Sequence, residues 1–76
     1  MKRFICWYAY KGMETEGGLA LEEPKIVKAN SIGEAMWIWN TKYRDIDMKG
    51  IYGSYEAYLK KGEFTGWGHW CEELAQ

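Results

Sequence analysis

The chain has little that marks a membrane protein, a secreted protein or a polyanion-binding protein. Its longest apolar runs cover residues 4–10 and 35–39, well short of the roughly 20 residues that a membrane-spanning helix needs. The first residues lack the pattern of a signal peptide. Ten basic residues against eleven acidic residues give a net charge of −1, which disfavours a general nucleic-acid binder. We therefore expect a cytoplasmic protein without membrane contact.

Residues that carry chemistry are also scarce. Cys6 and Cys71 are the only cysteines, and His69 is the only histidine. Two cysteines far apart in an intracellular chain are more often buried thiols than a disulfide. His69 and Cys71 share one face of a predicted strand, but the sequence offers no orienting acid for catalysis and no paired cysteines or fourth ligand for zinc. We expect no catalytic residue, no metal and no cofactor.

The length of 76 residues supports a single domain, residues 1–76, with one small core. Residues 3–10 are aromatic and β-branched, which predicts a first strand. Glycines and polar residues in 11–18 predict a turn. A second strand is expected over residues 19–29, interrupted at Pro24, which lacks an N–H group.

The strongest local signal is a capping box formed by Ser31 and Glu34, which predicts a main helix over residues 31–43. Its apolar stripe is expected to pack on the sheet and consists of Ile32, Ala35, Met36, Trp39 and Tyr43. Trp37 falls on the opposite, polar side of this helix. Burial in so small a chain does not account for a large ring on that side, so Trp37 either contacts a partner or is covered by a second helix or by the tail.

The second half of the chain predicts shorter elements. Residues 48–52 are expected to form a short strand. Ser54 is expected to cap a short second helix over residues 54–61, ending at Gly62, with a strand as the competing interpretation. Residues 64–71 have strand-like composition, and 72–76 are expected to be a tail. The predicted fold is α+β, with a three- to four-stranded, mostly antiparallel sheet packed by the main helix.

Aromatic residues are abundant: five Trp, six Tyr and two Phe. Alternation along the first strand separates Phe4, Cys6, Tyr8 and Tyr10 from Ile5, Trp7 and Ala9. If the last strand lies beside the first, Trp67, His69 and Cys71 line one face, and Phe64 and Trp70 line the other. The aromatic surplus either compensates for a thin core or forms a contact surface. The candidate partner-binding residues are Trp37, Trp7, Trp67, Tyr8 and Trp70.

The predicted hairpin is followed by the sequence KANSIGEA at residues 28–35. This succession of a strand, a capping-box helix and a returning strand resembles small uncharacterised phage and bacterial open reading frames. The resemblance covers residues 3–43 and carries no catalytic or ligand motif. Many small phage proteins of this kind bind a host protein stoichiometrically, some anti-restriction and anti-CRISPR inhibitors among them. The resemblance therefore implies an anti-defence or host-takeover role.

We expect a non-enzymatic protein-binding module that regulates or inhibits a larger protein. Two alternatives stay open. An apolar sheet face covered by the same face of a second copy makes the protein a homodimer. Aromatic residues on an open sheet also stack the bases of single-stranded nucleic acid, although the basic residues are scattered and diluted by acidic ones.

Overall fold

The computed structural model describes residues 1–8, 24–65 and 69–74. The turn expected over residues 11–18 lies outside this part of the chain, as do Trp67 and residues 9, 10 and 19–23 of the expected strands.

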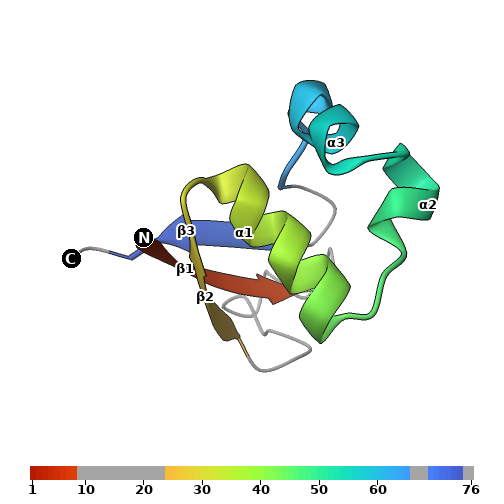
Figure 1. Cartoon of the computed structure of the whole chain (residues 1–76). Helices are drawn as coiled ribbons and strands as arrows, with labels where there is room; N and C mark the ends of the chain where they lie inside the picture. The colour runs from red at the N-terminus through yellow and green to blue at the C-terminus, as the bar shows by residue number, and fades with distance from the viewer. Residues whose placement is uncertain (9–23, 66–68, 75–76) are drawn as a thin grey trace.

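A three-stranded antiparallel sheet forms one layer of the molecule (Figure 1). Strand β1 (Lys2–Tyr8) lies in the middle, between β2 (Lys25–Ala29) and β3 (His69–Glu73). Pro24 immediately precedes the edge strand β2, where its missing N–H costs no hydrogen bond within the sheet. The predicted α+β class and the antiparallel sheet are confirmed.

The last strand differs from its predicted bounds. It runs from His69 to Glu73, so it continues into the segment expected to be a tail. The pairing with β1 explains the extension, because β1 offers partners as far as Phe4 opposite Glu73, and the Leu74 N–H donates to the Arg3 carbonyl at 2.8 Å. Phe64 is not in the strand, so the expectation that it shares a sheet face with Trp70 is wrong.

The main helix consists of α1 (Ile32–Ile38) and a continuing π-helical segment, η2 (Trp39–Tyr43). Ser31 caps it, with the Ser31 Oγ accepting the Glu34 N–H at 3.2 Å. The Glu34 carboxylate accepts the Asn30 N–H at 2.8 Å, so both partners of the predicted capping box satisfy backbone N–H groups at the helix start. The predicted range of 31–43 is confirmed.

The apolar stripe of this helix packs on the sheet as predicted, except at its end. Ala35, Met36 and Trp39 are buried, whereas Tyr43 is exposed. Tyr43 lies beside the lysines Lys25 and Lys42 rather than in the core. Lys25 is the first residue of the edge strand β2, so, among the residues that the structure describes, the last turn of the helix lies near the end of this strand.

The expected strand over residues 48–52 is wrong: these residues form the short helix α2 (Met48–Tyr52). Asp47 caps the helix, with its Oδ1 accepting the Gly50 N–H at 3.0 Å. A Cβ at position 50 would lie 2.3 Å from the Asp47 carboxylate, so glycine permits the close cap. The local cap overrides the strand-like composition of the segment.

The second predicted helix is confirmed as α3 (Tyr55–Lys61). Ser54 Oγ accepts the Ala57 N–H at 3.1 Å. The helix ends at Gly62, whose φ of 72° lies in the left-handed region that glycine adopts without strain. The competing strand interpretation is therefore wrong.

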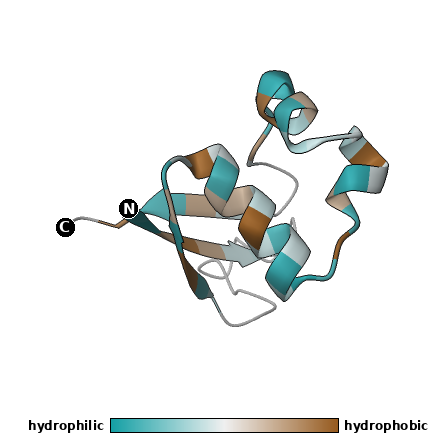
Figure 2. Cartoon of the chain, in the orientation of Figure 1, coloured by the Kyte–Doolittle hydropathy of each residue, from teal (hydrophilic) through white to brown (hydrophobic). Residues whose placement is uncertain are grey.

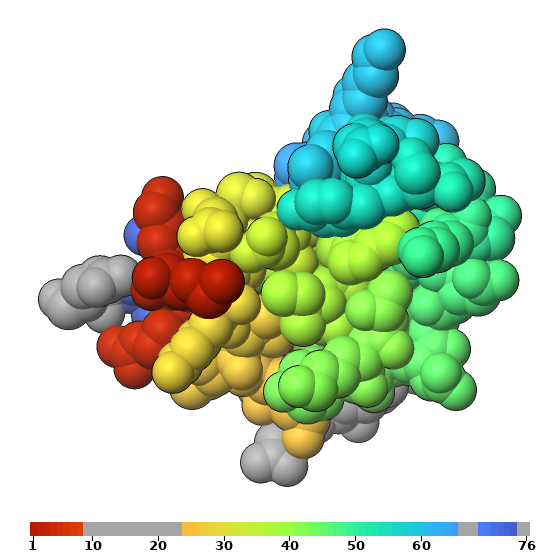
Figure 3. Space-filling view, viewed as in Figure 1, coloured from red at the N-terminus to blue at the C-terminus, as the bar shows by residue number. Residues whose placement is uncertain are grey.

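One hydrophobic core lies between the sheet and the helices, and α1, η2, α2 and α3 all contribute to it. In Figure 2 the ribbon of α1 alternates between apolar and polar segments. In the space-filling view, α3 packs against α1 on the side away from β2 (Figure 3). The buried residues are Phe4, Cys6, Val27, Ala29, Ala35, Met36, Trp39, Met48, Tyr58 and Cys71. None of the helices in the described ranges is long and apolar enough to cross a membrane.

Candidate interaction surface on the sheet

The two faces of the sheet differ sharply in burial. The inner face, which α1 covers, carries Phe4, Cys6, Val27, Ala29 and Cys71, all buried. The opposite face carries Ile5 and Trp7 from β1, Ile26 from β2 and Trp70 from β3. We call these four residues the outer face. Ile26 is 55% exposed and Trp70 is 48% exposed, whereas Ile5 and Trp7 are half-buried, so two of the four apolar side chains are open to solvent.

Strand register brings the four outer-face residues together. Ile5 lies directly opposite Ile26, and Trp7 lies directly opposite Trp70. Directly opposite residues of an antiparallel pair have Cβ atoms about 4.5–5.5 Å apart. The sheet therefore assembles one apolar surface from three strands that are distant in sequence.

Charged residues border the outer face. Arg3 and Lys28 are directly opposite each other, on the same side of the sheet as Ile5. Glu72 lies opposite Ile5 on the other edge strand. All three are exposed. The surface thus has a basic border on β1 and β2 and an acidic residue on β3, an arrangement that favours one orientation of a charged partner.

Tyr8 belongs to a different part of the molecule. It is half-buried at the inner-face end of β1, where its ring lies 5.1 Å from that of His69, and the Arg44 guanidinium lies over it at 4.6 Å. Arg44 also lies 5.1 Å from the Trp39 ring. Burial and the nearby Arg44 charge lower the pKa of His69 below its ordinary value, because both disfavour the protonated imidazole.

Trp37 is half-buried, in agreement with the alternative that a second helix covers this side of the main helix. Its ring lies 5.2 Å from the Tyr55 ring and 5.4 Å from the Tyr58 ring. Both tyrosines come from α3, which packs on this side of α1. The polar side of α1 is therefore partly covered by a helix whose position local sequence could not reveal.

Of the five predicted contact residues, the sheet brings together Trp7 and Trp70. Trp37 and Tyr8 lie elsewhere, and Trp67 is outside the described residues. Sequence reasoning did not single out Ile5 and Ile26 as contact residues. The available signal was alternation: Ile5 shares a face with Trp7, and Ile26 alternates with the buried Val27.

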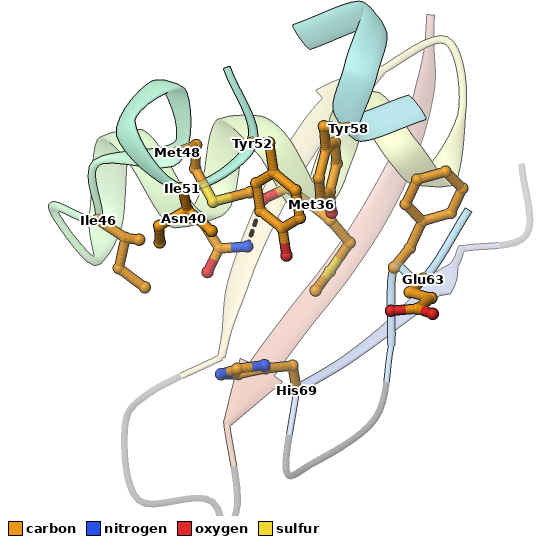
Figure 4. A pocket seen from close by; sticks show the side chains of 10 residues that line it. Met36, Asn40, Ile46, Met48, Ile51, Tyr52, Tyr58, Glu63 and His69 are labelled. Carbon is orange, nitrogen blue, oxygen red and sulfur yellow. Dashed lines mark hydrogen bonds between the residues drawn. The ribbon is translucent and has the colours of Figure 1, made fainter. Parts of the chain in front are cut away.

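A small pocket of about 130 Å³ lies on the inner-face side of the sheet, between the helices and the start of β3 (Figure 4). Its only buried polar residue is Asn40, whose Nδ2 donates to the Met36 carbonyl at 2.9 Å. Within the described ranges, every buried side-chain N or O atom has a partner. The pocket thus lacks an unsatisfied buried polar group to orient a ligand. Its lining consists of Met36, Asn40, Ile46, Met48, Ile51, Tyr52, Tyr58, Glu63, Phe64 and His69.

No cluster of three metal-ligating side chains occurs among the residues that the structure describes. Comparison of the chain with protein-family models, curated proteins and solved structures finds no match.

Proposed function

We propose that the protein is a non-enzymatic protein-binding module whose outer face docks on a larger protein, which it regulates or inhibits stoichiometrically. One observation carries the proposal: Trp7 and Trp70 are paired across two strands, on a face that Ile5 and Ile26 extend to the third strand. Tryptophan combines a large apolar area with a hydrogen-bonding N–H and is enriched among residues that dominate binding energies.

The size of the outer face favours a larger partner over a second copy. Within the described residues, β1 makes five pairs with each edge strand, and three strands over five residues span roughly 10 Å by 17 Å. Two such faces packed together fall well short of the about 800 Å² per partner that a stable interface buries. A larger protein can continue its contact from the outer face onto the charged border of Arg3, Lys28 and Glu72.

The test compares variants at two exposed apolar positions. Trp70→Thr removes the outer-face ring, whereas Ile51→Thr changes an α2 residue that is 64% exposed and away from the sheet. Proteins captured from a host lysate with each variant are identified by mass spectrometry. The captured protein is then purified and its affinity for each variant is measured.

We expect Trp70→Thr to weaken binding of the purified partner at least tenfold, since a hot-spot residue contributes about 2 kcal/mol or more. Ile51→Thr should bind like the unchanged chain. Equal affinity for the unchanged chain and Trp70→Thr, with both folded, would remove the outer face from the interface.

Binding of single-stranded nucleic acid is a second candidate, favoured by the placement of Arg3 and Lys28 on the same side as Trp7 and Trp70. Aromatic rings stack bases, and basic side chains contact phosphates. Oligonucleotides should then quench tryptophan fluorescence, less strongly as salt increases. Absence of quenching at low salt excludes this candidate. Light scattering of the same samples tests homodimer formation, which a monomeric mass at micromolar concentration excludes.

A further inference from the structure

The two cysteines meet in the centre of the protein, although 65 positions separate them in sequence. Cys6 lies on the central strand β1, directly opposite Cys71 on β3. Their Sγ atoms are 3.2 Å apart, both thiols are free, and both residues are buried. The predicted buried thiols are confirmed, and their close contact is a feature that the sequence could not reveal.

The strand register defines the type of pair that they form. The Leu74 N–H donates to the carbonyl of Arg3, the residue opposite it, which marks Arg3 and Leu74 as a hydrogen-bonded pair. Hydrogen-bonded and non-hydrogen-bonded pairs alternate along an antiparallel ladder. Three steps further along, Cys6 and Cys71 are a non-hydrogen-bonded pair. Such residues have Cα atoms about 4.5 Å apart, within the 4.4–6.8 Å range that disulfides span.

The two thiols are not equivalent. The Cys6 S–H donates to the Cys71 Sγ. This hydrogen bond lowers the pKa of Cys71, whereas the same bond and burial raise the pKa of Cys6. Cys71 also keeps 6% of its surface exposed, while Cys6 is fully buried. Because of this exposed surface, Cys71 is the sulfur that a small oxidant reaches first, and Cys6, 3.2 Å away, is positioned to react with it next.

We propose that Cys6 and Cys71 are a redox-active dithiol site that hydrogen peroxide oxidises to a disulfide linking β1 to β3. The Cys71 thiolate attacks one peroxide oxygen and the O–O bond breaks, giving a sulfenic acid and hydroxide, which takes up a proton to become water. The Cys6 sulfur then attacks the Cys71 sulfur, the S–O bond breaks, and the second water leaves with the Cys6 proton. Two thiols and one peroxide yield one disulfide and two waters. Peroxide is small enough for a site with so little exposed surface.

The disulfide changes the properties of the sheet. It closes a long loop through the central strand, which restricts the unfolded chain and stabilises the folded one. Cys6 and Cys71 immediately adjoin Trp7 and Trp70 in sequence, so the linkage forms directly behind the tryptophan pair of the outer face. The fluorescence of these tryptophans gives a second readout of oxidation.

The experiment treats the folded, unchanged chain with hydrogen peroxide, stops the reaction by alkylation at low pH, and measures intact mass and thermal unfolding. We expect a monomer lighter by about 2 Da, the loss of two hydrogens, with Cys6 and Cys71 joined in the peptide map. Its midpoint of unfolding should rise on the order of 10 °C. A dithiol reductant should restore the original mass and midpoint.

The control variants Cys6→Ala and Cys71→Ala each keep one thiol. They should show neither the loss of about 2 Da nor the rise in the midpoint of unfolding. Because the unchanged chain decides the result, the test holds even if a variant fails to fold. Three outcomes overturn the proposal: a folded chain that peroxide leaves reduced while the denatured chain is oxidised, a disulfide that forms only between two chains, or an internal disulfide that lowers the midpoint of unfolding.

Discussion

The inner and outer faces of the sheet are built from alternate residues of the same three strands, but their surroundings differ. On β2, Val27 is buried under α1, while its neighbour Ile26 points to the other side and is exposed. On β3, Cys71 is buried and Trp70 is half-exposed. Apolar character alone therefore does not identify the core; the side on which α1 packs does. On the outer face, Ile26 and Trp70 keep about half of their surface exposed.

The largest expected effect comes from the residue that joins the main helix to the inner face. Trp39 is among the largest fully buried side chains, and Trp39→Ala should lower the free energy of unfolding by about 3–5 kcal/mol. This is a large part of the stability of a small domain. Urea denaturation followed by circular dichroism measures it. A loss below about 1 kcal/mol would mean that the inner face does not dominate folding.

Adjacent residues of β2 give the most direct comparison of the two faces. Val27→Ala removes buried methyl groups, and we expect a loss of about 2 kcal/mol. Ile26→Thr keeps a β-branched side chain on the exposed side and should change stability by less than about 0.5 kcal/mol. Thermal unfolding of both variants tests the contrast. Similar losses at both positions would show that the outer face is also packed.

The packing of α1 on the inner face depends on the N-terminal cap of this helix. Ser31→Ala removes the hydroxyl that accepts the Glu34 N–H, and the expected cost is about 1 kcal/mol. Ser31→Asp is the matched control, because its carboxylate can accept the same N–H and suits a helix N-terminus. If both variants lose the same stability, the cap does not determine the position of α1.

The smallest expected effect is a pH dependence at the end of the inner face. His69 faces Tyr8, Trp39 and Arg44, and the folded protein lowers its pKa below the ordinary value of 6.5. The unfolded chain therefore binds this proton more readily. The neutral His69 therefore contributes fully to the free energy of unfolding above pH 6.5. This contribution is lost as the pH falls through 6.5 and below it. Denaturation curves between pH 5.5 and 7.5 should show this slope, and His69→Gln should reduce it.

Local sequence signals predicted the helices that begin with side-chain caps. The start of the main helix is satisfied by the hydrogen-bonding groups of Ser31 and Glu34. The start of α3 is satisfied by Ser54, and its end has the backbone freedom of Gly62. Asp47 caps α2 in the same way, but the strand-like residues that follow it concealed the signal. Alternation likewise predicted that Trp7 and Ile5 share a face.

The remaining features depend on contacts between distant segments. Trp37 is half-buried because α3 packs against it, and no pattern within the main helix encodes that contact. Trp7 and Trp70 are paired only because β3 lies beside β1. The sequence was compatible with this strand order but could not establish it. Phe64 precedes the strand, so strand alternation did not apply to it.

The pairing of β1 with β3 also affects how a newly made chain folds. Cys6 and Cys71, which face each other across these strands, are 65 positions apart. At about 5–20 residues per second, the ribosome needs several seconds to synthesise the intervening segment. During that time β1 has one unpaired edge, which can pair with strands of other chains. The three-stranded sheet is completed only after synthesis has passed Glu73.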